Sequence, residues 1–293
     1  MNKKIFIDSD VNILTGEDAE RALHKENDAK YFNEREGVSR VEKDRWRTAQ
    51  KAEKKHWMNL GIRAADDRNY DHADKFGGYE SIRGMKFDHA IELGCGPFTN
   101  LRLIGGIAEI GRCTLLDPLI DEYQAHPQCR YRTGKLVRDS YSGSPWMRTL
   151  RKGLWRAMPD GLRRLLPGIP LAGTLNMPIE EMPLNETYDL VVMINVIEHC
   201  YDAHALMSSI LRILRPGGVF VFHDRLYDAS IIRERVKEKY DAAHPLRVDQ
   251  KLLMEFLQRN FSPLFSQQDE KIHAFEGREE TVRSVYYIGR KIQ

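Results

Sequence analysis

The central part of the chain alternates between short apolar runs and segments with helical spacing. Four runs carry few polar residues, and each leads into a turn or a helical pattern: 90–93, 113–116, 190–194 and 219–222. Runs of this length that alternate with helical segments are typical of parallel strands covered on both faces. The pattern therefore predicts an α/β fold with a mostly parallel sheet.

The segment before this centre has a different pattern. Residues 1–87 are polar and mostly helical in spacing, with candidate helices near 16–32 and 39–60. The second helix carries Trp46, Ala49, Gln50, Glu53 and Trp57, which recur at spacings of three and four and so share one face. We expect a helical cap over residues 1–87, followed by one α/β domain over residues 88–293.

The segment beyond residue 225 also has its own pattern. Helical spacing indicates helices near 231–236 and 249–260. Two strand-like runs follow, at 264–275 and 281–288. The pair is predicted to form an antiparallel hairpin that ends the sheet.

Residues 130–170 form an insert with a strong positive charge. Ten basic and two acidic side chains give the insert a net charge of +8, whereas the whole chain carries +2. Apolar residues between 146 and 166 recur at spacings of three or four, which predicts a basic amphipathic helix interrupted at 159–161.

Three interpretations of this insert compete. It could be a lid whose arginines bind an anionic substrate such as a nucleotide-linked sugar, because guanidinium groups bind phosphate through paired hydrogen bonds. It could lie on a membrane surface, with Trp146 and Trp155 in the interface and the basic side chains on anionic lipid. The third interpretation is a solvated helix pair packed on the body or on a second subunit.

Composition sets outer limits on the function. The chain has 293 residues, 42% of them hydrophobic, which is enough for an ordinary core. Its four cysteines lack the C-x-x-C spacing of a metal site and are interpreted as reduced thiols. No apolar run approaches the roughly 18 residues of a membrane span. We therefore expect a cytoplasmic protein, with peripheral contact at the inner face of the membrane as the alternative.

The first strong chemical signal is the turn after the first apolar run. Glu92, Gly94 and Gly96 come at the carboxyl end of that run, where backbone can approach a nucleotide-like ligand without Cβ interference. Thr99 stands where a dinucleotide fingerprint has its third glycine, so the turn suits a ligand without a pyrophosphate.

This turn resembles motif I of the class I S-adenosylmethionine-dependent methyltransferases. Three further motifs follow in that family's order: Asp117 after the second run, Glu198-His199 after the third, and an R-P-G-G turn at 215–218 before the fourth. The resemblance covers residues 88–225. It implies a Rossmann-like sheet of seven strands with helices on both faces, S-adenosylmethionine as methyl donor and S-adenosylhomocysteine as product.

The resemblance also implies a donor site at the strand ends. Asp117 would bind the ribose hydroxyls, Ile179 and Glu180 would border the adenine, and the backbone at Asn195 would receive the ammonium group. Pro178 stands where the family often has an aspartate. The full set of expected donor-binding residues is Glu92, Gly94, Cys95, Gly96, Asp117, Pro118, Ile179, Glu180, Asn195 and Val196.

Two histidines are candidates for catalysis. His199 and His223 follow the third and fourth apolar runs, and an imidazole is a suitable base for a hydroxyl acceptor. The alternative for His199 is an orienting role near the donor. The Glu198-His199 pair also resembles the metal-binding E-x-x-E-H of some related enzymes, but Asn195 replaces the leading glutamate. No metal is therefore expected.

The pattern W-x-x-A-Q-x-x-E in the helix near 39–60 resembles relatives found in sugar and cell-surface glycan pathways. It implies a lid over the donor; the alternative is a helix that docks its tryptophans on the core, and both can hold. The predicted function is O-methylation of a sugar, nucleotide sugar or glycan precursor. Alternatives are a lipid-linked acceptor at a membrane, or a catalytically silent scaffold that binds the donor.

Macromolecular partners are less well defined. A nucleic acid is not expected, because no N/D-P-P-Y/F motif follows the third run and the insert has few aromatic residues for base stacking. Self-association through the insert or the amino-terminal helices is left open.

Overall fold

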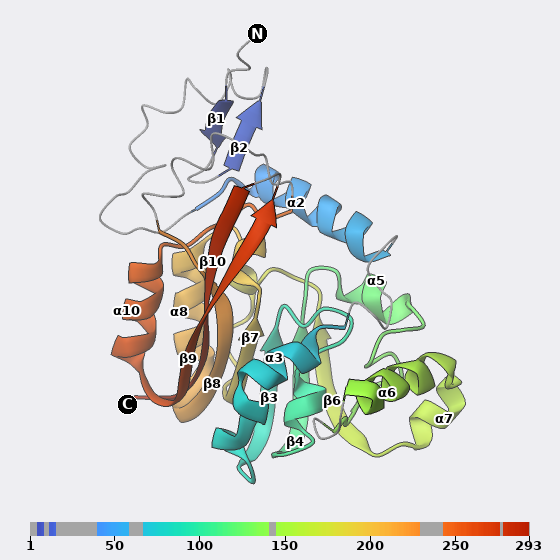
Figure 1. Ribbon diagram of the computed structural model, residues 1–293. Helices are drawn as coiled ribbons and strands as arrows, with labels where there is room; N and C mark the ends of the chain where they lie inside the picture. Colours follow the sequence, from blue (N-terminus) through green and yellow to red (C-terminus); the bar gives the residue numbers. More distant parts are fainter. Residues whose placement is uncertain are drawn as a thin grey trace.

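The computed structural model shows a central sheet with helices packed on both of its faces (Figure 1). The residues that it describes are 5–8, 12–15, 40–58, 67–140, 145–228, 243–275 and 278–292. The helices expected near 16–32 and 231–236 lie outside these residues. None of the helices within these ranges has the length and apolar character needed to cross a membrane.

The central sheet has eight strands. In spatial order these are β5 (Lys135–Val137), β6 (Gly168–Leu175), β4 (Glu109–Leu116), β3 (Lys86–Leu93), β7 (Tyr188–Ile194), β8 (Leu214–Leu226), β10 (Arg278–Lys291) and β9 (Phe261–Phe275). The five strands from β6 to β8 are parallel, whereas β5, β10 and β9 each pair antiparallel with a neighbour. The predicted α/β class with a mostly parallel sheet is confirmed.

The expected number of seven strands is wrong, because β5 adds an eighth at one edge. This strand has three residues and lies inside the insert, where it pairs with β6. Its central side chain, Leu136, is fully buried and joins the core. The insert is thus fastened to the sheet by backbone hydrogen bonds.

The helices connect or flank these strands. They are α2 (Lys43–His56), α3 (Asn69–Lys75), α4 (Leu101–Ile104), α5 (Ile120–Ala125), α6 (Pro145–Ala157), α7 (Asp160–Leu165), α8 (Ala203–Ile213) and α10 (Gln250–Asn260), with single turns η4 (Gly77–Ile82), η5 (Ile179–Glu181) and η6 (Ile197–His199). Near the amino terminus, β1 (Ile5–Asp8) and β2 (Asn12–Thr15) form a separate antiparallel pair. The insert helix is broken as predicted, but at 158–159 instead of 159–161, since α6 ends at Ala157 and α7 begins at Asp160.

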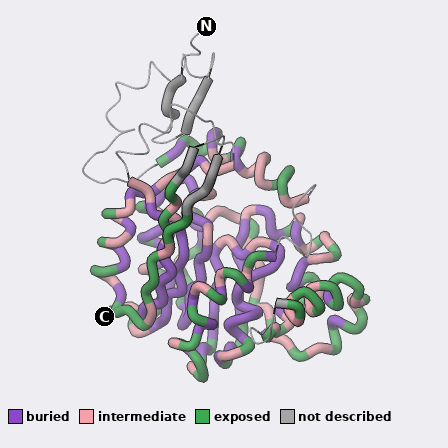
Figure 2. The backbone as a smooth tube through the Cα atoms, in the orientation of Figure 1, coloured by how far each residue is buried: buried purple, intermediate pink, exposed green. Residues whose placement is uncertain are grey.

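Alternate side chains of the strands supply two hydrophobic cores. On β7, Leu190 and Val192 face the core formed with α3, η4 and α4, whereas Val191 and Met193 face the core formed with α8 and α10. Figure 2 shows that the central strands are buried, whereas α6 and α7 are largely exposed. Burial on both faces explains why these strands are continuous apolar runs.

A buried ionic cluster joins the segment before α3 to the body. The Arg102 side chain is fully buried, and its Nη2 donates to Oδ2 of Asp67 at 2.5 Å. Arg130 is 3.7 Å from the same carboxylate, and Arg102 also approaches Asp139. A buried charge is tolerated only with such partners. The cluster therefore fixes the position of α3, whose side chains form one wall of the site described next.

Candidate active site

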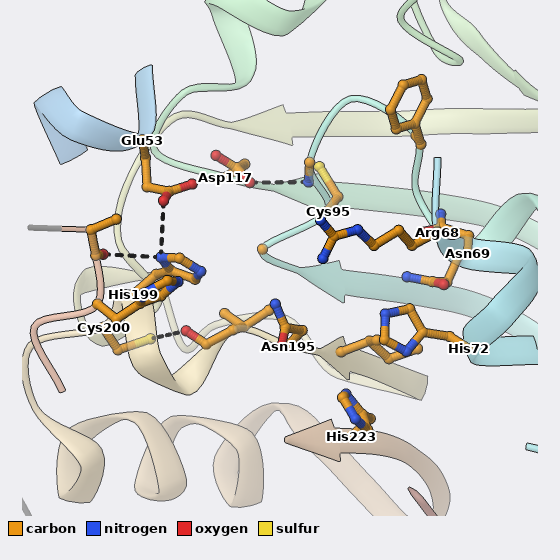
Figure 3. A pocket seen from close by; sticks show the side chains of 18 of the residues that line it. Glu53, Arg68, Asn69, His72, Cys95, Asp117, Asn195, His199, Cys200 and His223 are labelled. Atoms are coloured by element: carbon orange, nitrogen blue, oxygen red, sulfur yellow. Dashed lines mark hydrogen bonds and ion pairs between the residues drawn. The ribbon is translucent and has the colours of Figure 1, made fainter. Parts of the chain in front are cut away.

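A cavity of about 940 Å³ opens at the carboxyl ends of the parallel strands (Figure 3). Nine of the ten expected donor-binding residues line it: Gly94, Cys95, Gly96, Asp117, Pro118, Ile179, Glu180, Asn195 and Val196. His199 and His223 line it as well. Strand ends thus bring together residues that are far apart in sequence, as expected for an open parallel sheet.

The turn after β3 depends on its first glycine. Gly94 has a φ of +66°, and a Cβ placed there would lie 2.6 Å from a methyl carbon of Val196. Gly96 has a φ of +52°, but a Cβ there would meet nothing within 4 Å. Gly94 is therefore needed for both its backbone angle and its close packing, whereas Gly96 is needed for its angle alone.

Glu92 does not line the cavity, contrary to expectation. The side chain is almost completely buried, and its two oxygens accept hydrogen bonds from the backbone of Asn100 and Leu101 and from the side chains of Thr99 and Asn100. Both carboxylate oxygens of Glu92 therefore already have hydrogen-bond donors from the protein itself. Glu92 therefore shapes the turn that leads into α4 instead of contacting a ligand.

Asp117 is held at the end of β4 by two backbone amides. Gly96 N donates to its Oδ2 at 3.0 Å, and Leu119 N donates to its Oδ1 at 2.9 Å. Burial raises the pKa of this carboxyl group to about 6, and the two amides oppose that rise. The group faces the cavity with its remaining lone pairs, where it can accept hydrogen bonds from a ligand.

Glu180 has one satisfied and one unsatisfied oxygen. Its Oε1 accepts hydrogen bonds from the backbone amides of Tyr201 and Asp202, at 2.6 and 3.0 Å. Its Oε2 is buried and has no hydrogen-bond partner among the described residues. A buried acceptor without a partner is costly, so a ligand in the cavity would stabilise it by donating a hydrogen bond.

The chain turns sharply out of the sheet at Asn195. This residue has a φ of +60°, and its backbone amide donates to the carbonyl of His223. The next two amides, of Val196 and Ile197, donate to Oδ2 of the buried Asp224. Burial and the nearby carboxylate of Glu198 raise the pKa of Asp224. Asp224 therefore holds the turn that forms the cavity floor.

His199 faces the cavity with a carboxylate beside it. Its Nδ1 lies 3.3 Å from the carbonyl oxygen of Ala243 and 3.7 Å from Oε1 of Glu53 (Figure 3). Both neighbours are acceptors, so the hydrogen belongs on Nδ1 and Nε2 keeps its lone pair. Burial lowers the pKa of His199, although the charge of Glu53 opposes this. The ring is therefore neutral at pH 7.

Helix α2 supplies Glu53 and also fixes the backbone of His199. Trp46 Nε1 and Gln50 Nε2 donate to the carbonyl oxygen of His199, at 3.0 and 3.2 Å. Trp57, just after the helix, donates to Oε2 of Glu53. Both tryptophans pack on aromatic rings of the body, and they line the cavity together with Gln50 and Glu53.

Glu53, His199 and His244 form a cluster of possible metal ligands. Their donor atoms lie within 4.8 Å of one another. Two imidazoles and a carboxylate could hold a small divalent cation. Glu198 is not part of this cluster, since its Oε1 lies 3.4 Å from Nη1 of Arg225. The E-H pair noted in the sequence thus does not act as a unit.

His223 lies in a stack of rings away from Glu53 and His199 (Figure 3). Its ring centroid is 4.8 Å from that of His72 and 4.1 Å from that of Tyr286. Burial lowers the pKa of His223 well below its usual value. Among the described residues no carboxylate pairs with His223, so this ring lacks the orienting contact that Glu53 gives His199.

The match to a family model decides the identity. A model described as a methyltransferase domain matches residues 83–269, more than half of the chain. The chain belongs to this methyltransferase family. Its methyl donor is S-adenosylmethionine, which fits the glycine turn, the carboxylate of Asp117 and the unsatisfied oxygen of Glu180. Comparison with curated protein sequences finds no match.

Solved structures resemble this methyltransferase at low identity. The N-methyltransferase NodS from Bradyrhizobium japonicum, in complex with S-adenosylhomocysteine, is 15% identical, covers 84% of this chain and 99% of its own, and has a TM-score of 0.49. A methyltransferase of unconfirmed function from Bacillus halodurans is 12% identical over 75% of this chain and 98% of its own, with a TM-score of 0.49. Likeness at this level carries no argument about the acceptor.

Sequence reasoning missed several residues that line the methyltransferase cavity. Asn69 and His72 on α3 and His244 after the undescribed segment were not foreseen, whereas Gln50 and Glu53 on α2 were placed on the face of a possible lid without a role in the site. One signal was available: Gln50 and Glu53 are polar residues on the same helix face as two tryptophans. Polar groups on a face that packs against the body need partners there.

The described part of the insert does not line the cavity. None of the described residues between 130 and 170 lines it. Instead, Arg148 forms an ion pair with Asp74, and Lys152 donates to the backbone oxygen of Asp67. These contacts join α6 to the segment around α3. Of the three interpretations of the insert, a lid whose arginines line the cavity is therefore not seen among its described residues.

Proposed function

We propose that this methyltransferase methylates a hydroxyl group of a small or medium-sized acceptor, such as a sugar, a nucleotide sugar or a glycan precursor. The pairing of His199 with Glu53 at the cavity wall carries this proposal. A hydroxyl must lose its proton as it attacks the methyl group, and a neutral imidazole oriented by a carboxylate is suited to accept it. An uncharged amine acceptor needs no such base.

When bound, S-adenosylmethionine supplies a methyl group activated by a sulfonium. The protein has three tasks: it aligns the acceptor oxygen with the methyl carbon and the sulfur, it excludes water, and it accepts the hydroxyl proton. We assign the last task to Nε2 of His199. Glu53 remains beside Nδ1 and stabilises the imidazolium that results.

The donor is held by groups with complementary chemistry. Asp117 is placed to accept hydrogen bonds from the ribose hydroxyls, and the unsatisfied Oε2 of Glu180 to accept one from the adenine amino group. Gly94 and Gly96 leave room for the methionine part, whose ammonium would meet the backbone at Asn195. Support comes from the shared cavity and from the free acceptors on these two carboxylates.

Donor affinity is expected to fall below pH 6. The raised pKa of Asp117, about 6, means that its carboxylate becomes protonated as the pH falls through that value. A protonated carboxyl accepts hydroxyl hydrogen bonds less well, so affinity should weaken by up to roughly tenfold per pH unit below the pKa. Calorimetric titration between pH 5 and 8 would measure this. In Asp117→Asn, affinity should be lower and should lose this dependence; an unchanged slope would contradict the assignment.

Glu180→Gln is expected to weaken donor binding roughly tenfold, in line with a hydrogen bond worth about 1–2 kcal/mol. The amide oxygen can still accept from the amides of Tyr201 and Asp202, but its NH₂ group would meet the adenine amino group donor to donor. Glu181→Gln is the matched control, because this neighbour is half-exposed and pairs with Lys43 outside the cavity. Equal losses in both variants would rule out the adenine contact.

The function itself is tested by measuring S-adenosylhomocysteine release with a panel of sugars, nucleotide sugars and glycan precursors. Turnover with a hydroxyl acceptor supports the proposal. Donor binding without turnover on any acceptor would favour a scaffold, and turnover confined to amines would overturn the assignment of the base.

A lipid-linked acceptor is a second candidate. It is favoured by the group of apolar side chains that α6 and α7 expose to solvent. A panel containing a polyprenyl-linked sugar beside the free sugar would separate the two, since a preference for the lipid-linked form points to this candidate.

A further inference from the structure

Exposed apolar side chains gather on the insert. Seven large apolar residues are exposed in the described part of the chain, and five of them lie on α6 and α7. We call this group the α6–α7 apolar face; its members are Trp146, Leu150, Leu154, Leu162 and Leu165. Trp146 is 65% exposed and Leu165 is 79% exposed, so they contribute little to the core. Exposed apolar groups of this kind mark interaction sites.

Helix α6 has the reverse of the usual orientation. Trp146, Leu150 and Leu154 follow one another at spacings of four and so form one stripe, which faces solvent. A surface helix of a globular domain normally turns its apolar stripe toward the core. Packing against this protein does not explain the stripe.

Polar contacts hold α6 in this orientation from the opposite side. The ion pair between Arg148 and Asp74 and the hydrogen bond from Lys152 to Asp67 join its inner side to the segment around α3. Trp155 is buried, with the guanidinium carbons of Arg130 and Arg163 each 4.5 Å from its ring. The apolar stripe is thus fixed outward by buried and ionic contacts.

The charge around the face restricts its partner. Residues 145–168 contain six basic side chains and one acidic side chain, Asp160, which pairs with Arg132 and Arg163. Arg156 on α6 and Arg164 on α7 are exposed on the same two helices. A second copy of the chain related by a two-fold axis would place these cations against their own equivalents. The arrangement favours an anionic partner with an apolar layer.

We propose that the α6–α7 apolar face docks on the surface of an anionic membrane. Trp146 and the leucines enter the interface between headgroups and acyl chains, while Arg156 and Arg164 contact anionic headgroups. Two short helices that lie in the interface suit such an attachment, which crosses no bilayer. The inference goes beyond the proposed hydroxyl acceptor and does not depend on it.

Vesicle sedimentation with the full chain tests this proposal. Vesicles of phosphatidylcholine with phosphatidylglycerol should bind the protein roughly tenfold or more tightly than phosphatidylcholine alone, because each exposed arginine adds to the attraction. Leu150→Ser with Leu154→Ser should weaken binding by roughly tenfold or more. Leu264→Ser with Ile292→Ser is the control, since it replaces the other two large apolar side chains that are exposed among the described residues. Arg156→Gln with Arg164→Gln should remove the preference for anionic vesicles.

A labelled thiol gives a position-specific measurement. The four native cysteines are buried, so a cysteine introduced as Leu150→Cys can be labelled selectively with an environment-sensitive dye. Its emission should shift to the blue with anionic vesicles, whereas the same label at Leu264→Cys should not shift. Donor affinity and the unfolding midpoint should match those of the unmodified chain, because the substituted side chains are exposed.

Three results would overturn the proposal. The first is absence of binding to either kind of vesicle. The second is an equal loss of binding in the Leu264 and Ile292 control. The third is a concentration-dependent dimer, without vesicle binding, that needs Leu150 and Leu154, because it would assign the face to a second copy. None of these depends on turnover, so failure here is distinct from failure of the proposed reaction.

Discussion

Replacing His199 by asparagine is expected to lower kcat roughly 10²- to 10⁴-fold, the usual contribution of a positioned base. Asparagine can still donate to the carbonyl of Ala243, but it has no group that accepts a proton near neutral pH. Donor affinity should change little, since the base acts on the acceptor. Release of S-adenosylhomocysteine gives the rate, and calorimetry gives the affinity.

His204→Asn is the matched control for this substitution. His204 is an exposed histidine on α8, only five residues away, and it does not line the cavity. It should retain full activity. Wild-type turnover in His199→Asn would show that another group, or no group, takes the proton.

The variant Glu53→Gln tests whether Glu53 acts on the His199 imidazole through its charge or only supports the structure around it. The amide keeps the shape of the side chain but removes the negative charge that opposes the lowering of the His199 pKa. The pKa should fall further, so the acid limb of the pH–rate profile should move to lower pH. A purely structural role for Glu53 would reduce the rate without moving this limb.

Gly94→Ala is expected to weaken donor binding roughly a hundredfold, because overpacking and a left-handed backbone angle for alanine together cost about 2–4 kcal/mol. Its Cβ would lie 2.6 and 2.7 Å from two methyl carbons of Val196, so the turn and the cavity floor must move apart. Gly94 and Val196 both line the donor cavity. Calorimetric titration would measure the loss.

Two further variants make this test specific. Gly84 has a similar φ of +71°, but a Cβ placed there would meet nothing within 4 Å. The Gly84→Ala variant should therefore lower stability slightly and leave donor affinity intact. Gly94→Ala combined with Val196→Ala removes the colliding methyl groups and should recover much of the affinity. If the double variant were as weak as the single one, the collision would not be the cause.

Local pattern was sufficient to predict four of the five parallel strands and the carboxyl ends of three of them, β3, β4 and β7. The runs that became β3, β4, β7 and β8 are buried on both faces, which is why each is continuously apolar in sequence. The strand β5 could not be foreseen, because three residues with one buried side chain leave no periodic signal. Its pairing with β6 is decided by residues more than thirty positions away.

The site was predictable where it follows strand ends and unpredictable where it depends on distant contacts. Asp117 and Asn195 could be placed from their position after apolar runs. Glu53 could not, since its partner His199 is far along the chain and only the folded structure brings α2 against η6. Glu92 was misassigned because the motif locates it near the ligand, whereas backbone amides of its own turn take up its oxygens.

The orientation of the insert helix was the second feature that could not be predicted from the sequence. Spacing predicted an amphipathic helix but could not say which face turns outward. That choice depends on Asp67 and Asp74, which belong to another segment and attract the basic side of α6.

Helix α2 both lines the cavity and contacts the proposed base. Trp46 and Gln50 on α2 donate hydrogen bonds to the carbonyl oxygen of His199. Glu53 on the same helix places its carboxylate beside the imidazole. Any displacement of α2 away from the cavity would also take the carboxylate of Glu53 away from the imidazole. With His199 as the proposed base, a displaced α2 would therefore leave the imidazole without its carboxylate, and methyl transfer would require the helix in the position seen here.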